Sequence, residues 1–285
     1  MNRVIYPNIG CTDVFGTCLL SVSDSKQAYK DRLHSISGKV IREWGDFDTR
    51  CAPKNFHLFI PCEPRKPEQL IERNVTKKDL KELYTVYMLK ADSEARKVYD
   101  KLRACSKGLC PLCGIYGVDT LDHYLPKARY PLLSVNPKNL IPACTHCNGV
   151  KSASICSTAS EQTLYPYNDD SKFYQTDWVT ATITAPYGIL TFDFQATPPQ
   201  EWLRVERDRV INHFITFGLR KKYALNAAQF VTTITSDIRR MLLDGDHITV
   251  QNHYAGLAVK QKENSTLRVV YNAIANDLNI CGGRF

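Results

Sequence analysis

Two Cys-x-x-Cys pairs, Cys110-Pro-Leu-Cys113 and Cys144-Thr-His-Cys147, constrain the fold of this chain more than any other feature of its sequence. Each pair forms a tight turn when it binds a metal, and four thiolates complete a tetrahedral shell that leaves no open position for catalysis. The sequence therefore predicts one structural zinc ion, bound by these four cysteines. His146, inside the second pair, is expected to point away from the ion because four sulfur atoms already fill its shell.

The cysteine count supports metal binding over disulfide formation. The chain has 285 residues and 11 cysteines, and an odd number excludes a fully paired internal framework. The first residues, MNRVIYPNIG, contain no basic segment that leads into an apolar one, and no apolar run approaches the roughly 18–20 residues that span a bilayer. We therefore expect a protein of the reducing cytoplasm, and neither a membrane protein nor a secreted one.

The charge of the chain does not by itself indicate a partner. The net charge is +8, from 37 basic and 29 acidic residues. Residues 105–170, which contain both cysteine pairs, hold equal numbers of basic and acidic side chains, and no block of like charge occurs anywhere. Non-specific binding to a polyanion depends on a basic field, so recognition by charge alone is not indicated.

Hydrophobic periodicity divides the chain into three regions. Residues 1–104 are predicted to be mainly helical, with helices over 26–44 and 76–102 and a short strand over 55–61. Residues 105–198 consist of short segments broken by glycine and proline, followed by a β-hairpin from Trp178 to Gln195. Residues 199–285 are predicted to form helical segments to the end.

Residues that carry chemistry lie between and just after the cysteine pairs. Asp122 and His123 are adjacent, Asn139 precedes the second pair, and Asn148 and Lys151 follow it. Carboxylate and amide oxygens suit Mg²⁺ or Mn²⁺, and a neutral imidazole can take a proton from water. A hard cation, a general base and a lysine are together the groups that phosphodiester hydrolysis needs.

The order of these residues resembles a known family. Four short motifs follow one another between about Leu109 and Lys151: Cys-x-x-Cys, Asp-His-x-x-Pro-Lys, Asn-Leu and Cys-x-x-Cys-Asn-x-x-Lys. This order resembles the zinc-bearing HNH endonucleases, a branch of the ββα-metal nuclease superfamily. The resemblance implies an α+β fold, with a ββα-metal nuclease core held by the four-cysteine zinc site and flanked by the hairpin and helical segments. Bacterial domains of this kind with flanking helices resemble the HNH partners of ATPases in Septu-type anti-phage systems.

The resemblance also implies a role for each residue. His123 would be the general base, and Asp122 would be a ligand of the catalytic Mg²⁺ or Mn²⁺. Asn148 would be the second ligand, in a place where some members of the family have histidine. Asn139 would fix the loop before the helix by hydrogen bonds to backbone, and Lys151 would face a phosphate. One-metal hydrolysis of this kind leaves 5′-phosphate and 3′-hydroxyl products.

The resulting hypothesis is a DNA-cutting metal-dependent endonuclease, the effector subunit of a bacterial defence complex with an ATPase partner. Two alternatives share the cysteines: a non-catalytic zinc-stabilised nucleic-acid-binding or scaffold module, and a redox protein that uses its Cys-x-x-Cys thiols. Asn136 competes with Asn139 for the loop-fixing role. Lys127, Arg129 and Lys138 are further candidates for phosphate contacts.

Overall fold

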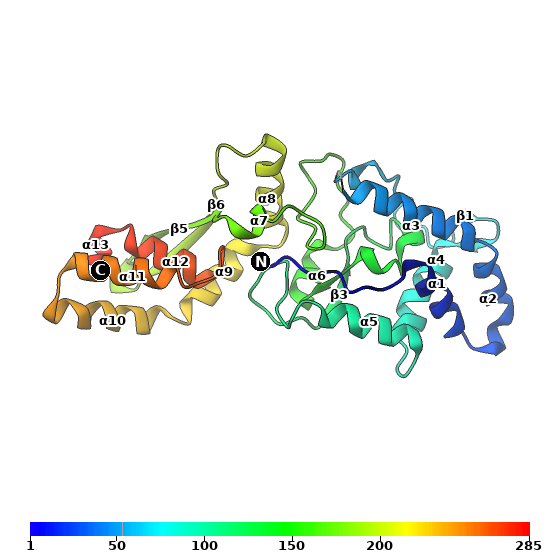
Figure 1. The fold of residues 1–285 in the computed structure, drawn as a ribbon, viewed down its shortest axis with the longest axis horizontal. Coiled ribbons are helices and arrows are strands. Elements are labelled where there is room, and N and C mark those ends of the chain that lie inside the picture. The colour runs from blue at the N-terminus through cyan, green and yellow to red at the C-terminus, as the bar shows by residue number, and fades with distance from the viewer. Residues whose placement is uncertain (53) are drawn as a thin grey trace. The chain divides into compact units, whose positions relative to one another are not determined.

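The computed structural model describes residues 1–52 and 54–285 (Figure 1). The protein is a mixed α+β structure, and the strands of the described residues form three small antiparallel sheets of two strands each. The chain divides into two compact units. The first unit contains Asn2–Pro111 and Tyr116–Asn168, and the second contains Met1, Leu112–Ile115 and Asp169–Phe285.

This division groups the three predicted regions differently. The N-terminal region 1–104 and most of the cysteine-containing segment lie together in the first unit. The β-hairpin lies instead with the C-terminal helices in the second unit.

The first unit contains short helices around two of the small sheets. Its elements are α1 (Cys11–Leu20), η1 (Asp24–Lys26), α2 (Gln27–His34), α3 (Ser37–Cys51), η2 (Phe56–Leu58), β1 (Leu70–Glu72), β2 (Val75–Thr76), α4 (Lys77–Glu82), η3 (Leu83–Met88), α5 (Glu94–Ala104), β3 (Thr120–His123), η4 (Pro131–Leu133), η5 (Pro137–Asn139), β4 (Leu140–Ala143) and α6 (Thr145–Lys151). Helix α5 packs beside β3 and β4 (Figure 1).

Both helices predicted in the N-terminal region are present but interrupted. The first is divided into α2 and α3 at Ser35 and Ile36, and α3 then continues to Cys51. The second is divided into α4, the π-helical turn η3 and α5. Asp92 adopts a left-handed backbone with φ 58°, and the Ser93 hydroxyl accepts from the Arg96 N–H to begin α5. Side-chain capping of this kind starts a new helix instead of continuing the previous one.

The strand predicted over residues 55–61 is wrong. The segment instead forms the 3₁₀ turn η2. Phe56 and Phe59 are both buried, and their rings contact Phe47. A spacing of three residues puts both rings on one side of a 3₁₀ turn, whereas a strand would place them on opposite faces. Aromatic packing in the core of the first unit therefore decides the local conformation.

The second unit contains the hairpin and the C-terminal helices, and these elements form in the stretches of sequence predicted for them. Strands β5 (Val179–Thr184) and β6 (Thr191–Ala196) pair in antiparallel register through the turn η6 (Pro186–Gly188). The helices are α7 (Lys172–Gln175), α8 (Arg204–Thr216), α9 (Leu219–Ala228), α10 (Val231–Asp244), α11 (His247–Ala258), α12 (Thr266–Ala275) and α13 (Leu278–Cys281). No helix in the described part of the chain has the length and apolar character needed to cross a lipid bilayer.

An ion pair is buried in the second unit. The Arg209 guanidinium donates two hydrogen bonds to the Asp169 carboxylate, at 3.1 and 2.7 Å. Both side chains are almost fully buried. A buried charge is tolerated only when it is paired and hydrogen-bonded, so this bidentate contact fixes the start of the unit against α8.

Candidate functional site

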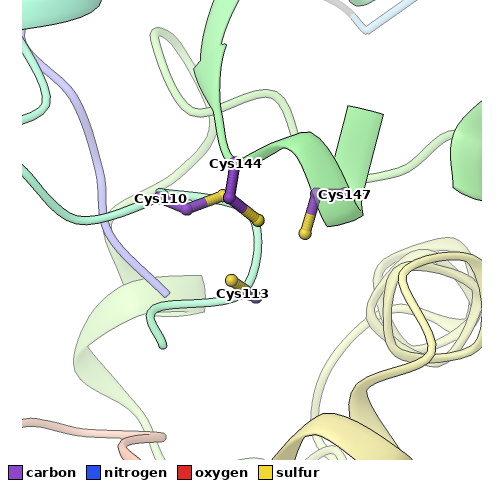
Figure 2. Close-up of side chains that lie close together, drawn as sticks. All are labelled: Cys110, Cys113, Cys144 and Cys147. Carbon is purple, nitrogen blue, oxygen red and sulfur yellow. The ribbon is translucent and has the colours of Figure 1, made fainter. Parts of the chain in front are cut away.

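Four buried cysteines come together where the two Cys-x-x-Cys pairs meet (Figure 2). The Sγ atoms of Cys110, Cys113, Cys144 and Cys147 all lie within 4.8 Å of one another. Zn–S bonds of about 2.3 Å in a tetrahedral site place the sulfur atoms roughly 3.8 Å apart. The donor atoms and their spacing therefore fit a zinc ion. His146 is exposed and stacks on Tyr116, with ring centroids 4.7 Å apart, outside this cluster.

Local backbone geometry explains how each pair forms its turn. The Cys110 N–H donates to the Tyr116 carbonyl at 2.9 Å, and Gly114 reverses the chain with φ +70°, a region that favours glycine. Cys144 lies immediately before α6, and its carbonyl accepts from the N–H groups of Cys147 and Asn148. The first turn of α6 is thus built on two cysteines, and Asn148 follows directly after the second.

Asp119 begins α6 from outside the helix. Its carboxylate accepts from the Thr145 N–H at 2.7 Å and from the Thr145 hydroxyl at 2.6 Å. The first N–H groups of a helix have no partner within the helix, and a carboxylate at this position satisfies one of them. The contact connects the segment just before β3 to the helix that carries Asn148.

The effect of this cap is testable. Asp119→Ala is expected to lower the free energy of unfolding by about 1 kcal/mol, because it removes the acceptor for the Thr145 N–H. Urea unfolding of the full chain measures the change. Asp119→Asn retains an acceptor at the same place and is the matched control, expected to unfold close to wild type. Equal stability of the Ala variant and wild type would show that the cap contributes nothing.

Strand β3 ends on the residue pair expected to carry chemistry. β3 and β4 pair in antiparallel register, with Asp122 opposite Ile141 and His123 opposite Leu140. Helix α6 follows β4 after a single residue, Cys144. Helix α6 therefore begins beside the start of β3, where Asp119 contacts Thr145, and its last turn reaches the end of β3.

The His123 ring has a defined orientation. Its Nε2 lies 2.8 Å from the Ser134 carbonyl oxygen, and because a carbonyl can only accept, Nε2 is the protonated nitrogen. Nδ1 of the neutral ring then carries the lone pair. The edge of the ring packs against Tyr84, with centroids 4.5 Å apart. Burial lowers the pKa of His123 well below its ordinary value, and the charge of Lys127 lowers it further. The imidazole is therefore neutral at neutral pH, as a general base must be.

Asp122 is buried beside His123 and pairs with a lysine. Its Oδ2 accepts from the Lys151 ammonium at 3.2 Å. Burial raises the pKa of the Asp122 carboxyl, and the charge of Lys151 opposes that rise. The buried carboxylate therefore has a counter-charge from α6.

The structure places Lys151 differently from the expectation that it faces a phosphate. Besides Asp122, its buried ammonium donates to the carbonyls of His123 and Tyr124, at 2.6 and 2.7 Å. An ammonium has three N–H donors, and these three acceptors account for all of them. Lys151 therefore ties the end of α6 to the end of β3.

Asn139 and Asn136, the two candidates for the loop-fixing role, make different contacts. Asn139 is fully buried, and its side chain donates to the carbonyls of Leu125 and Leu133 and accepts from the Leu125 N–H. Asn136 accepts from the Lys138 N–H and so caps the turn η5. Asn139 is thus the residue that holds the loop after β3 against the chain before β4.

A pocket of about 310 Å³ opens over these residues. Asp122, His123 and Asn148 all contribute to its walls, and Asn148 is half-buried there. The complete set of residues around the pocket is Lys81, Asp122, His123, Pro126, Lys127, Ala128, Asn148, Ser152 and Ala153. The base and the two oxygen ligands expected from the sequence therefore share one cavity.

The basic candidates differ in their surroundings. Arg129 donates to the Cys62 carbonyl at 2.7 Å, and Lys138 pairs with Asp48 at 2.6 Å. Lys127, by contrast, lines the pocket. Lys81 of α4 also lines it. Sequence reasoning missed this residue because it lies some forty positions before Asp122 and has no local signal for such a role.

Comparison with known proteins shows two similarities. Over 174 residues, or 60% of this chain, the sequence is 32% identical to protein ea31 of Escherichia phage lambda, and the match covers 58% of ea31. Over 31 residues, or 11% of this chain, it is 55% identical to the Septu protein PtuB of Bacillus thuringiensis, and that match covers 12% of PtuB. Each relative is thus matched over less than two thirds of its length. No family model and no solved structure matches the chain.

Proposed function

We propose that this chain is a metal-dependent endonuclease of the HNH kind that hydrolyses DNA phosphodiester bonds as part of a bacterial defence complex. One observation carries the proposal: Asp122, His123 and Asn148 line a single pocket, although two of them come from β3 and the third from α6. The order of these residues around the cysteine pairs, which resembles the HNH endonucleases, supports it.

His123 acts as the general base. Because the Ser134 carbonyl engages Nε2, the lone pair of Nδ1 takes a proton from the attacking water. The hydrogen bond fixes the tautomer and, with the Tyr84 contact, holds the ring in one orientation. Burial keeps the ring neutral, and thus able to accept a proton, at neutral pH.

Asp122 and Asn148 would hold the catalytic cation. Carboxylate and amide oxygens are the donors that Mg²⁺ and Mn²⁺ prefer, and both side chains reach the same pocket. When bound, such a cation supplies positive charge to the phosphate and to the departing 3′ oxygen. The charge of Lys151 favours the ionised form of the buried Asp122, and the contact holds the carboxylate beside His123. Asn148 has no proton to donate as an acid, so its contribution is as a ligand.

A partner would direct the cutting. The segment 105–170 has no net charge, so it lacks the basic field that supplies non-specific affinity for DNA. The resemblance to HNH partners of ATPases and the short similarity to PtuB both support an ATPase as that partner. Affinity purification from native cells, with the mass of the purified protein measured in solution, tests whether a partner is bound. A lone monomer that cuts DNA efficiently at physiological salt would contradict the need for a partner.

Metal dependence tests the endonuclease proposal directly. Asn148→Ala is expected to raise the Mg²⁺ or Mn²⁺ concentration needed for half-maximal plasmid cutting by about 10-fold or more, because it removes one oxygen ligand. Asn148→Asp keeps an oxygen donor and is the matched control. Asp122→Ala should have the same effect, but it also leaves the buried Lys151 without its carboxylate, so its thermal stability must be measured in parallel. Plasmid cutting by wild type that ignores added EDTA would contradict the proposal.

A further inference from the structure

Two lysines from distant parts of the chain line the same pocket as the proposed catalytic residues. Lys81 belongs to α4, in the N-terminal region for which the sequence predicts no chemistry, and Lys127 follows β3. We propose that Lys81 and Lys127 form a phosphate-binding pair, which holds a backbone phosphate of a polynucleotide beside His123. The inference rests on the proposed function and names the contacts by which that site binds its substrate.

Neither lysine is neutralised by an ion pair of its own, although the Asp122 carboxylate opposes part of the pKa shift at Lys127. Among the residues that the structure describes, neither lysine makes an ion pair. Lys127 is half-buried, and the charge of Lys81 adds to the effect of burial in lowering the pKa of Lys127. Asp122 is already paired with Lys151, so it offsets the repulsion between the two lysines only in part, and an anion placed between them relieves the rest. The pocket is therefore suited to a phosphate.

The position of Lys127 is tied to that of the proposed base. Its Nζ lies 4.8 Å from the centroid of the Tyr84 ring, and the same ring packs against His123 at 4.5 Å. The Tyr84 hydroxyl is directed at the Leu121 carbonyl of β3, 3.4 Å away. One aromatic side chain, anchored on β3, thus contacts both the base and the lysine.

The backbone of α4 that carries Lys81 is held in place by hydrogen bonds. Helix α4 begins with a capping box in which Thr76 and Asp79 exchange hydrogen bonds. Next to Lys81, the Leu80 carbonyl accepts from the Ser134 hydroxyl at 2.6 Å, and the carbonyl of that same serine accepts from His123 Nε2 at 2.8 Å. Movement of α4 would therefore also disturb the base, so Lys81 has a set place relative to His123.

The other basic side chains considered for phosphate contacts are already engaged. Lys151 uses its donors on Asp122 and on backbone carbonyls, while Arg129 and Lys138 bond to Cys62 and Asp48. Lys81 and Lys127 are the basic residues that line the pocket. A phosphate bound there would lie within the cavity that His123 and Asn148 also line, which is where the backbone of a nucleic acid substrate must pass.

The experiment measures binding separately from cutting. A fluorescein-labelled DNA duplex is titrated with the zinc-containing full chain in buffer without Mg²⁺, Mn²⁺ or a chelator, and anisotropy gives Kd at several salt concentrations. Each phosphate contact contributes about 0.9 to the slope of log K against log salt. Lys81→Ala and Lys127→Ala should each reduce the slope by about that amount, and weaken binding about eightfold at roughly 0.1 M salt. The double variant should reduce the slope by about twice as much.

Control variants separate this pair from general charge effects. Lys78 is exposed on the same helix α4 and lies outside the pocket, so Lys78→Ala should leave both the slope and Kd unchanged. Lys81→Arg retains a cation and should bind close to wild type. Competition distinguishes a polynucleotide site from a site for free phosphate: unlabelled duplex should displace the label at micromolar concentration, and inorganic phosphate at equal ionic strength should not.

The outcomes distinguish this inference from the endonuclease proposal. The phosphate-binding pair would be overturned if Lys81→Ala and Lys127→Ala bound duplex with the wild-type slope. It would also be overturned if Lys78→Ala lost as much affinity for duplex as they do. Either result would leave the endonuclease proposal intact. Displacement by inorganic phosphate alone would overturn the polynucleotide assignment. Wild type that shows the expected slopes but does not cut with Mg²⁺ or Mn²⁺ would support the pair and contradict the nuclease.

Discussion

Freshly purified protein is expected to contain one zinc ion per chain, and Cys144→Ser is expected to abolish folding of the first unit. Cys144 provides one of the four clustered sulfur atoms and also begins α6 through its carbonyl. Structural zinc binding is worth about 10–16 kcal/mol in small zinc domains, more than the whole stability of a typical domain. Elemental analysis after desalting measures the zinc, and circular dichroism with thermal melting measures the folding.

A control variant isolates the metal effect from the chemistry of cysteine replacement. Cys62 is half-buried in the same unit but lies outside the cluster, so Cys62→Ser should keep both zinc and the melting transition. Cys144→Ser should instead give insoluble or unfolded protein, not a folded but inactive one. The structural role of the metal would be contradicted if wild type contained less than about half an equivalent of zinc. It would also be contradicted if Cys144→Ser were soluble and melted at the wild-type temperature.

Features encoded by short spacing could be predicted from the sequence. The four cysteines form two pairs with two residues between the members of each, and the structure brings all four together. The hairpin was equally accessible, because alternation around Pro186–Gly188 defines two strands with one buried face each. In both cases the information lies within a few residues, and local geometry is enough to decide the structure.

Contacts that depend on tertiary packing could not be predicted in this way. The Ser134 carbonyl that orients His123 is a backbone group, and any residue type would provide it. Tyr84, which contacts His123, and Lys81, which lines the pocket, come from elements far earlier in the chain. Lys151 has the expected residue type and spacing, but its ammonium turns inward because three acceptors converge on it. The sequence could indicate which residues take part, but not which way each one faces.

Loss of the proposed base is expected to remove activity without removing the fold. His123→Ala should reduce plasmid cutting by about 10²-fold or more, because it removes the group that takes the proton from water. His123→Asn keeps an N–H that can donate to the Ser134 carbonyl, so it separates the loss of the base from the loss of the buried hydrogen bond. The measurement is the rate of plasmid nicking by each variant with saturating Mg²⁺ or Mn²⁺. Zinc content and melting temperature are measured on the same preparations.

The matched control is a second histidine in the same segment. His146 is exposed beside the cysteine cluster and stacks on Tyr116, so it shares the neighbourhood of the zinc site but lies outside the pocket. His146→Ala should therefore cut DNA at close to the wild-type rate. If both His123 variants retain zinc and stability but lose cutting, catalysis is separable from folding and a purely structural zinc module is excluded. If nicking persists in both after contaminating nuclease has been removed, His123 is not the base, and the orientation imposed by Ser134 serves only to pack the ring.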